Sequence, residues 1–244
     1  MEYKDFDRMV NEAEGTYTRR FTPSVTFPVL MRKVYTWMTL AMLITGITAY
    51  GVATSPVILQ TLFTNKLLFF GLIAAELGIV FAISGMINKL SLTTATLLFI
   101  AYSVINGATL SSIFIVYTME SIGQVFFITA GTFGAMALLG YTTKKDLTGL
   151  GQILFMALIG LIIATVVNMF VGSTILQTLT SYAGVLIFVG LTAYDSQKIK
   201  MMLEEQDSTS ESAQKLALLG SLTLYLDFIN LFIYLLRIFG SRRD

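Results

Sequence analysis

Long apolar stretches separated by short polar breaks constrain the fold of this chain more than any other feature. Of its 244 residues, 55% are hydrophobic and only 13% are charged, whereas a soluble domain usually carries charge on about a quarter of its residues. An apolar run of about 20 residues is long enough to cross the hydrocarbon core of a bilayer as a helix. The sequence therefore predicts an all-α membrane protein.

Seven stretches are predicted to span the membrane. They lie at about 34–54, 67–86, 92–118, 122–141, 150–171, 175–194 and 216–239. Together they predict one transmembrane domain over residues 34–240, between an N-terminal tail at 1–33 and a C-terminal end at 241–244. An acidic, serine-rich stretch at about 204–214 is predicted to be a cytoplasmic linker between the last two spans.

The distribution of Lys and Arg predicts the orientation of the chain. Most of these residues precede the first span or follow the second, fourth and sixth spans. The positive-inside rule places those segments in the cytoplasm. An odd number of spans then puts the N-terminus in the cytoplasm and the C-terminus outside.

Missing residue types exclude several classes of function. The chain contains no cysteine and no histidine, which excludes disulfides, thiolate metal sites, histidine-ligated haem and Ser-His-Asp catalysis. Its net charge is only +1, and the basic residues are spread over short loops, so we expect no nucleic-acid partner. We expect no cofactor.

An aspartate lies near the middle of the last apolar run, LYLDFINLFIYLLRIFG at 224–240. An ionised carboxylate at the bilayer centre costs at least about 2.5–3.5 kcal/mol, so Asp227 is predicted to face protein or water. Residues at the helical period form one polar stripe on this span: Gly220, Thr223, Asp227, Asn230 and Tyr234. Asn230 is therefore a candidate residue of a cation pathway.

A second aspartate, Asp195, ends the sixth apolar run in AYDSQ at 193–197. If that helix continues to Leu203, Asp195 lies about 12 Å from its end, a depth similar to that of Asp227 in the next, antiparallel span. Two such carboxyl groups would share a proton and titrate as a coupled unit. Loss of the proton would leave two charges that repel or bind a hard cation such as calcium. The alternative is a solvated Asp195 and a structural, hydrogen-bonded Asp227.

Glu76 is a third carboxylate within the predicted spans, near the middle of the second one in AAEL at 74–77. It is a candidate for binding cations or relaying protons along a pathway. The alternative is a structural hydrogen bond to polar residues of the third or fifth span, such as Ser103, Asn106, Thr165 or Asn168.

With these residues in view, the sequence resembles the Bax inhibitor-1 family, also called the transmembrane Bax inhibitor motif family. The resemblance is carried by AAEL, TTKKDL at 142–147, ALIG at 157–160, AYDSQ and the run at 224–240. It implies a bacterial inner-membrane protein whose central seventh helix is wrapped by the other six. It also implies a pH-sensitive calcium leak, gated by the aspartates that match Asp195 and Asp227, and it matches Glu76 to the family's acidic residue in the second helix.

The sequence departs from the family in one place. Members can carry an arginine near the cytoplasmic end of the second helix, able to pair with the aspartates. Here that region reads ISGMINKLS at 83–91, and Lys89 is its only basic residue. Lys89 is therefore the candidate for a basic latch, a cation that would pair with the aspartates. Lysine lacks the planar guanidinium with which arginine binds a carboxylate through two hydrogen bonds.

Two functions other than a channel are compatible with parts of this sequence. The first, suggested by the family resemblance, is a non-transporting modulator that binds another membrane protein, such as a protease or a death-related factor. Intramembrane aspartyl proteases also pair a YD motif with an aspartate in the next span, but their second aspartate is flanked by glycine, whereas Asp227 lies in LYLDF. We therefore expect no enzymatic activity.

Overall fold

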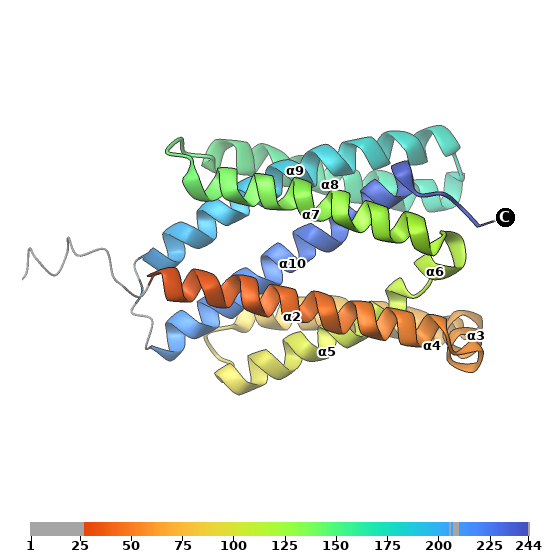
Figure 1. Ribbon diagram of the computed structural model, residues 1–244, viewed down its shortest axis with the longest axis horizontal. Coiled ribbons are helices and arrows are strands. Elements are labelled where there is room, and N and C mark those ends of the chain that lie inside the picture. The colour runs from red at the N-terminus through yellow and green to blue at the C-terminus, as the bar shows by residue number, and fades with distance from the viewer. Residues whose placement is uncertain (1–26, 205, 207–209, 244) are drawn as a thin grey trace, which may run out of the picture.

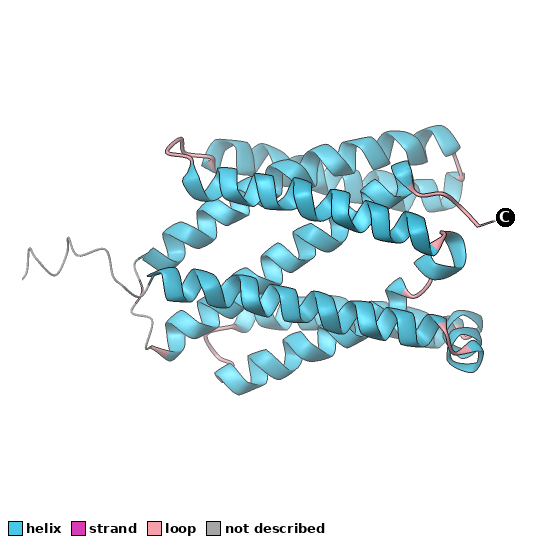
Figure 2. Cartoon of the chain, in the orientation of Figure 1, coloured by secondary structure: helices cyan, strands magenta, loops and turns pink. Residues whose placement is uncertain are grey.

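The computed structural model describes residues 27–204, 206 and 210–243 as a bundle of α-helices (Figures 1 and 2). Within these residues no strand forms, and a single isolated bridge joins Tyr117 to Arg242. The helices are α2 (Phe27–Ala53), α3 (Pro56–Thr64), α4 (Lys66–Met86), α5 (Leu92–Leu110), α6 (Ile113–Val116), α7 (Met119–Thr142), α8 (Thr148–Val171), α9 (Thr174–Glu204) and α10 (Glu211–Phe239).

Seven of the described helical segments are long and apolar enough to cross a membrane, which confirms the predicted all-α, seven-span class. The third span combines α5 with the short helix α6 and ends at Val116. Helix α3 lies in the loop between the first two spans and was not predicted. Of the expected N-terminal tail, residues 1–26 lie outside the described part of the chain.

The two helices that carry the aspartates are longer than their apolar runs. Helix α9 continues past residue 194 to Glu204, and α10 already begins at Glu211, inside the linker expected at 204–214. The extension of α9 is stabilised because Ile199 and Leu203 are buried, while Lys198 on the other face is exposed. Such an amphipathic segment is helical without being apolar enough to stand out in a hydropathy pattern.

Helix α10 is the central helix of the bundle. In its apolar window 67% of the residues are buried, against 33% or less in every other span. It packs mainly against α9, α2, α7 and α5, and it crosses the middle of Figure 1 between the α7–α9 and α2–α5 sides. The family resemblance implied that all six other helices wrap α10, but α4 packs mainly against α5, and α8 mainly against α9.

Glycines allow the helices around α10 to approach closely. A Cβ at Gly140 of α7 would overlap the backbone carbonyl oxygen of Ala193 in α9. A Cβ at Gly107 of α5 would lie 2.6 Å from the carbonyl oxygen of Thr45 in α2. Small residues at such crossings let backbones pack directly, which is the main way helices associate within lipid.

Candidate functional site

The polar stripe of α10 faces α9. A Cβ at Gly220 would contact Ile199, the Tyr234 ring stacks on Phe188 with centroids 5.8 Å apart, and Asp227 lies beside Asp195. These contacts follow one antiparallel register, in which a later residue of α10 meets an earlier residue of α9. The sequence-predicted contact between the two aspartate-bearing spans therefore occurs in the structure.

Asp195 and Asp227 form the centre of the candidate site. Their side chains lie within hydrogen-bonding reach of each other across the α9–α10 contact. Asp227 is 4% exposed, and no donor among the described residues reaches its buried Oδ2 atom. Asp195 is half-buried. A proton on either carboxyl would supply the missing donor, because an ionised carboxylate can only accept hydrogen bonds.

Residues that follow Asp195 in AYDSQ hold α9 in place. The Ser196 hydroxyl donates to the carbonyl oxygen of Ala137 in α7 at 2.8 Å, next to the close approach of Gly140 to Ala193. Sequence reasoning gave Ser196 no role. Because both contacts fix the backbone on either side of Asp195, they also fix where its carboxyl group meets α10.

Gln197 connects α9 to the loop between α7 and α8. Its Oε1 accepts from the Leu147 backbone N–H at 2.9 Å, and its Nε2 donates to the Lys145 carbonyl oxygen at 2.8 Å. Within this loop the Asp146 carboxylate accepts from the backbone N–H and the hydroxyl of Thr148, at 2.9 and 2.6 Å. These bonds, chiefly the one from the hydroxyl, hold the pKa of the Asp146 carboxyl below its ordinary value.

Glu76 lies apart from the aspartate pair, on the other side of α10. Its Oε1 accepts from the Thr109 hydroxyl at 2.7 Å, and its side chain also bonds with Asn106. The Tyr225 hydroxyl donates to Asn106 Oδ1 at 3.0 Å and pairs with the Thr45 hydroxyl at 2.7 Å. Asn106 was among the expected structural partners of Glu76, whereas Thr109, Tyr225 and Thr45 were not foreseen.

The other candidate residues occupy separate places. Asn230 lies on the α9-facing stripe and donates through Nδ2 to the Leu226 carbonyl oxygen of its own helix at 2.8 Å. Lys89 lies exposed in the turn after α4 and forms no ion pair within the described residues. The cation that acts electrostatically on Asp195 is Lys198, one turn further along α9.

The candidate site offers a cation two carboxyl groups, those of Asp195 and Asp227. No cluster of three or more acidic, histidine or cysteine side chains occurs in the part of the chain that the structure describes. Calcium takes about six to eight oxygen ligands. Asp195 and Asp227 can therefore supply only part of a calcium shell, and water or backbone oxygens must complete it.

Comparisons with known proteins match nearly the whole chain. The sequence model of a family described as "Inhibitor of apoptosis-promoting Bax1" matches residues 28–244. Inner membrane protein YbhL of Escherichia coli K12 is 52% identical over 222 residues, which cover 91% of this chain and 95% of that protein. An uncharacterized protein of Borreliella burgdorferi is 48% identical over 214 residues, covering 88% and 92%. The comparisons confirm the family resemblance.

Proposed function

This chain belongs to the Bax inhibitor family, and we propose that it is a calcium leak channel whose opening depends on the protonation of Asp195 and Asp227. The observation that carries the proposal is the contact between these two carboxyl groups across the α9–α10 interface. Because α10 is central, a change at this contact acts on the helix that holds the bundle together.

The proposed switch follows from the charge of the pair. While one proton is shared, the carboxyl groups hydrogen-bond and hold α9 against α10. When that proton is lost, two negative charges face each other in a site where water cannot screen them well, and they repel. The same pair of charges attracts a hard cation. The calcium leak is therefore expected to increase as the pH rises.

Calcium is the proposed ion because every polar group offered by the site is an oxygen ligand or an amide. Asn230 lies on the same stripe as Asp227 and is proposed to line the pathway. Glu76 is proposed as a second, separate cation-attracting group, reached from the α4–α5 side of α10. Lys89 is proposed to act as the basic latch in a second conformation, in which α4 moves toward α9 and Lys89 pairs with the aspartates.

The proposed location is a bacterial inner membrane, with the N-terminus in the cytoplasm and the C-terminus outside. The Lys and Arg distribution supports this orientation. The printed name of the E. coli relative supports the membrane. Accessibility of single cysteines introduced at exposed positions in the α7–α8 loop and in α3 would test the orientation, because the chain has no cysteine of its own.

Calcium flux into liposomes tests the proposed function. The purified protein is reconstituted around a calcium-sensitive dye, and entry is recorded from about pH 5 to pH 9, the range over which a shared carboxyl proton is lost. Asp195→Asn and Asp227→Asn should each flatten the pH dependence. Asp146→Asn is the matched control, because the low pKa of Asp146 keeps it ionised over this whole range.

Two results would contradict the proposal. A leak that keeps its pH dependence in both asparagine variants would remove the aspartate pair from the switch. No leak at any pH, from protein shown to be folded, would instead favour the non-transporting modulator that binds another membrane protein.

A further inference from the structure

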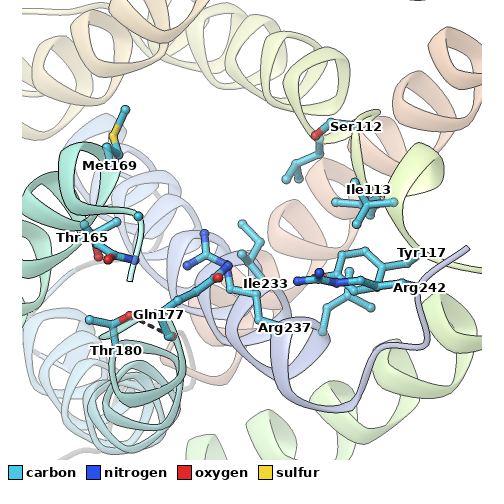
Figure 3. Close-up of a pocket in the computed structure, with 15 residues that line it drawn as sticks. Ser112, Ile113, Tyr117, Thr165, Met169, Gln177, Thr180, Ile233, Arg237 and Arg242 are labelled. Carbon is cyan, nitrogen blue, oxygen red and sulfur yellow. Dashed lines mark hydrogen bonds between the residues drawn. The ribbon is translucent and has the colours of Figure 1, made fainter. Parts of the chain in front are cut away.

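A cavity of about 600 Å³ lies at the C-terminal end of α10, away from the aspartate pair (Figure 3). Its walls come from the end of α5 with α6, the end of α8, the start of α9 and the last turns of α10. Figure 3 shows Arg237 between the Thr165–Gln177 side and the Ser112–Tyr117 side, and Arg242 beside Tyr117. The proposed calcium function makes no use of this cavity.

Arg242 is placed at the cavity by the segment that follows α10. The Ser241 backbone N–H donates to the Ser121 hydroxyl at 2.8 Å, and the Ser241 carbonyl accepts from the Thr118 backbone N–H at 3.1 Å. The Arg243 backbone N–H donates to the Val116 carbonyl at 2.9 Å. Bonds on both sides of Arg242 thus fix its backbone against the α6–α7 junction.

Arg237 reaches the cavity from the last turn of α10, with its guanidinium 5.2 Å from the centre of the Tyr234 ring. Neither Arg237 nor Arg242 forms an ion pair with another described residue, and no acidic side chain of the described chain lines the cavity. Two guanidinium groups without counter-charge therefore make this a cationic cavity.

The neighbouring polar groups also offer donors. The side-chain oxygen of Asn168 already accepts from the Ser173 backbone N–H at 2.9 Å, which leaves its amide N–H groups for a ligand. Gln177 adds a second side-chain amide to the lining. Guanidinium groups combined with amide donors fit a ligand that carries several acceptor oxygens and a negative charge, and a phosphate group meets both requirements.

The remaining walls indicate a lipid ligand. Met169 lines the cavity and is 73% exposed, on a helix whose apolar window is only 6% buried, so the cavity borders the lipid-facing surface of α8. From Thr165 to Gly172 it extends roughly 10 Å along that helix. Met169 and Arg237 each lie two residues before the end of their helix, so the cavity opens to the lipid-facing surface at the depth where headgroups lie.

We propose that this cavity binds an acidic phospholipid, with its phosphate between Arg237 and Arg242 and its apolar part leaving past Met169 onto the lipid-facing surface of α8. The absence of an acidic side chain from the described lining favours a headgroup with net negative charge over a zwitterionic one. A lipid held here would bridge the α5–α6 side and the α8–α9 side of the bundle at the end of α10.

Native mass spectrometry of the detergent-solubilised protein tests the proposal. Wild type should bind phosphatidylglycerol at least about tenfold more tightly than phosphatidylcholine, and Arg237→Gln and Arg242→Gln should each weaken phosphatidylglycerol binding about tenfold. Lys66→Gln is the matched control, since it removes one exposed positive charge from the same end of the bundle but does not line the cavity. It should leave binding within about twofold.

A second measurement separates the lipid from a free anion and checks folding. Phosphatidylglycerol should raise the thermal unfolding temperature of wild type and Lys66→Gln, but not that of the arginine variants, whose lipid-free unfolding temperatures should equal that of wild type. If Lys66→Gln weakens phosphatidylglycerol binding as much as the arginine variants do, the effect comes from surface charge, and the proposed site is wrong. Displacement of the lipid by inorganic phosphate at equal concentration would overturn the lipid assignment.

Discussion

Tyr225 and Asp227 lie two residues apart on α10 and face opposite sides of that helix. The Tyr225 hydroxyl bonds with Asn106 of α5 and Thr45 of α2, while the Asp227 carboxyl meets Asp195 of α9. The central helix is therefore held by polar contacts on two faces. One contact joins two carboxyl groups, whereas the other joins neutral hydroxyl and amide groups.

Replacing Tyr225 with phenylalanine tests whether the polar contacts on these two faces of α10 act independently. The change removes one hydroxyl and leaves the buried oxygen of Asn106 without its tyrosine donor, which should lower the free energy of unfolding by about 1–3 kcal/mol. The pH midpoint of calcium flux should stay where it is in wild type, because the aspartate pair is not touched. Unfolding in mixed detergent micelles and flux in liposomes measure the two effects.

Tyr182→Phe is the control for Tyr225→Phe. Tyr182 lies in α9, the helix that carries Asp195, but the residue is 55% exposed. It should change neither stability nor flux. A shift of the pH midpoint in Tyr225→Phe would mean that the two faces of α10 are coupled and would contradict their independence.

Gly140→Ala should displace α7 from α9. Its new Cβ would overlap the carbonyl oxygen of Ala193, two residues before Asp195, and backbone cannot move aside as a flexible side chain can. Overpacking of this kind costs about 1–3 kcal/mol. Gly134→Ala, on the same helix and with no atom within 4 Å of its new Cβ, is the matched control. It should be neutral or slightly stabilising, because alanine favours helix, and equal losses in both variants would contradict the predicted overlap.

The sequence was sufficient to predict the spans and the pairing of the two aspartate-bearing helices. Lipid offers no hydrogen bonds to the backbone, so each long apolar run has to be helical, and hydropathy alone reveals it. The contact between Asp195 and Asp227 followed from one further condition, that α9 continue beyond Tyr194 to about Leu203. The structure meets that condition, since α9 ends at Glu204.

Contacts between distant segments could not be predicted in the same way. Thr45 and Tyr225 are 180 residues apart in the chain, and Ser121 and Ser241 are 120 apart. Neither pair has a local pattern, because each depends on how whole helices cross. Arg242 illustrates the result: in the sequence it is one of several basic residues near the C-terminus, and only the docked segment places it at a cavity.

Gln197→Ala should free the loop between α7 and α8. The side chain of Gln197 is the partner of both the Leu147 N–H and the Lys145 carbonyl, so its removal should speed hydrogen exchange of the Leu147 amide at least about tenfold. Hydrogen exchange with mass spectrometry on the peptide spanning 142–148 measures this. Lys198→Ala, next to Gln197 but exposed, is the control, and equal acceleration by it would contradict a specific anchor.

Lys198 and Lys89 can be distinguished as the basic group that acts on the aspartate pair. Lys198 attracts the ionised form of Asp195, whereas Lys89 lies exposed in the turn after α4. Removing a nearby positive charge makes the proton harder to lose, so Lys198→Gln should move the midpoint of calcium flux to higher pH. The shift should shrink at about 1 M salt, where the Debye length falls to about 3 Å. Lys89→Gln should leave the midpoint unchanged. The reverse result, a shift in Lys89→Gln alone, would mean that α4 approaches α9 in the conducting protein and that Lys89 is the latch.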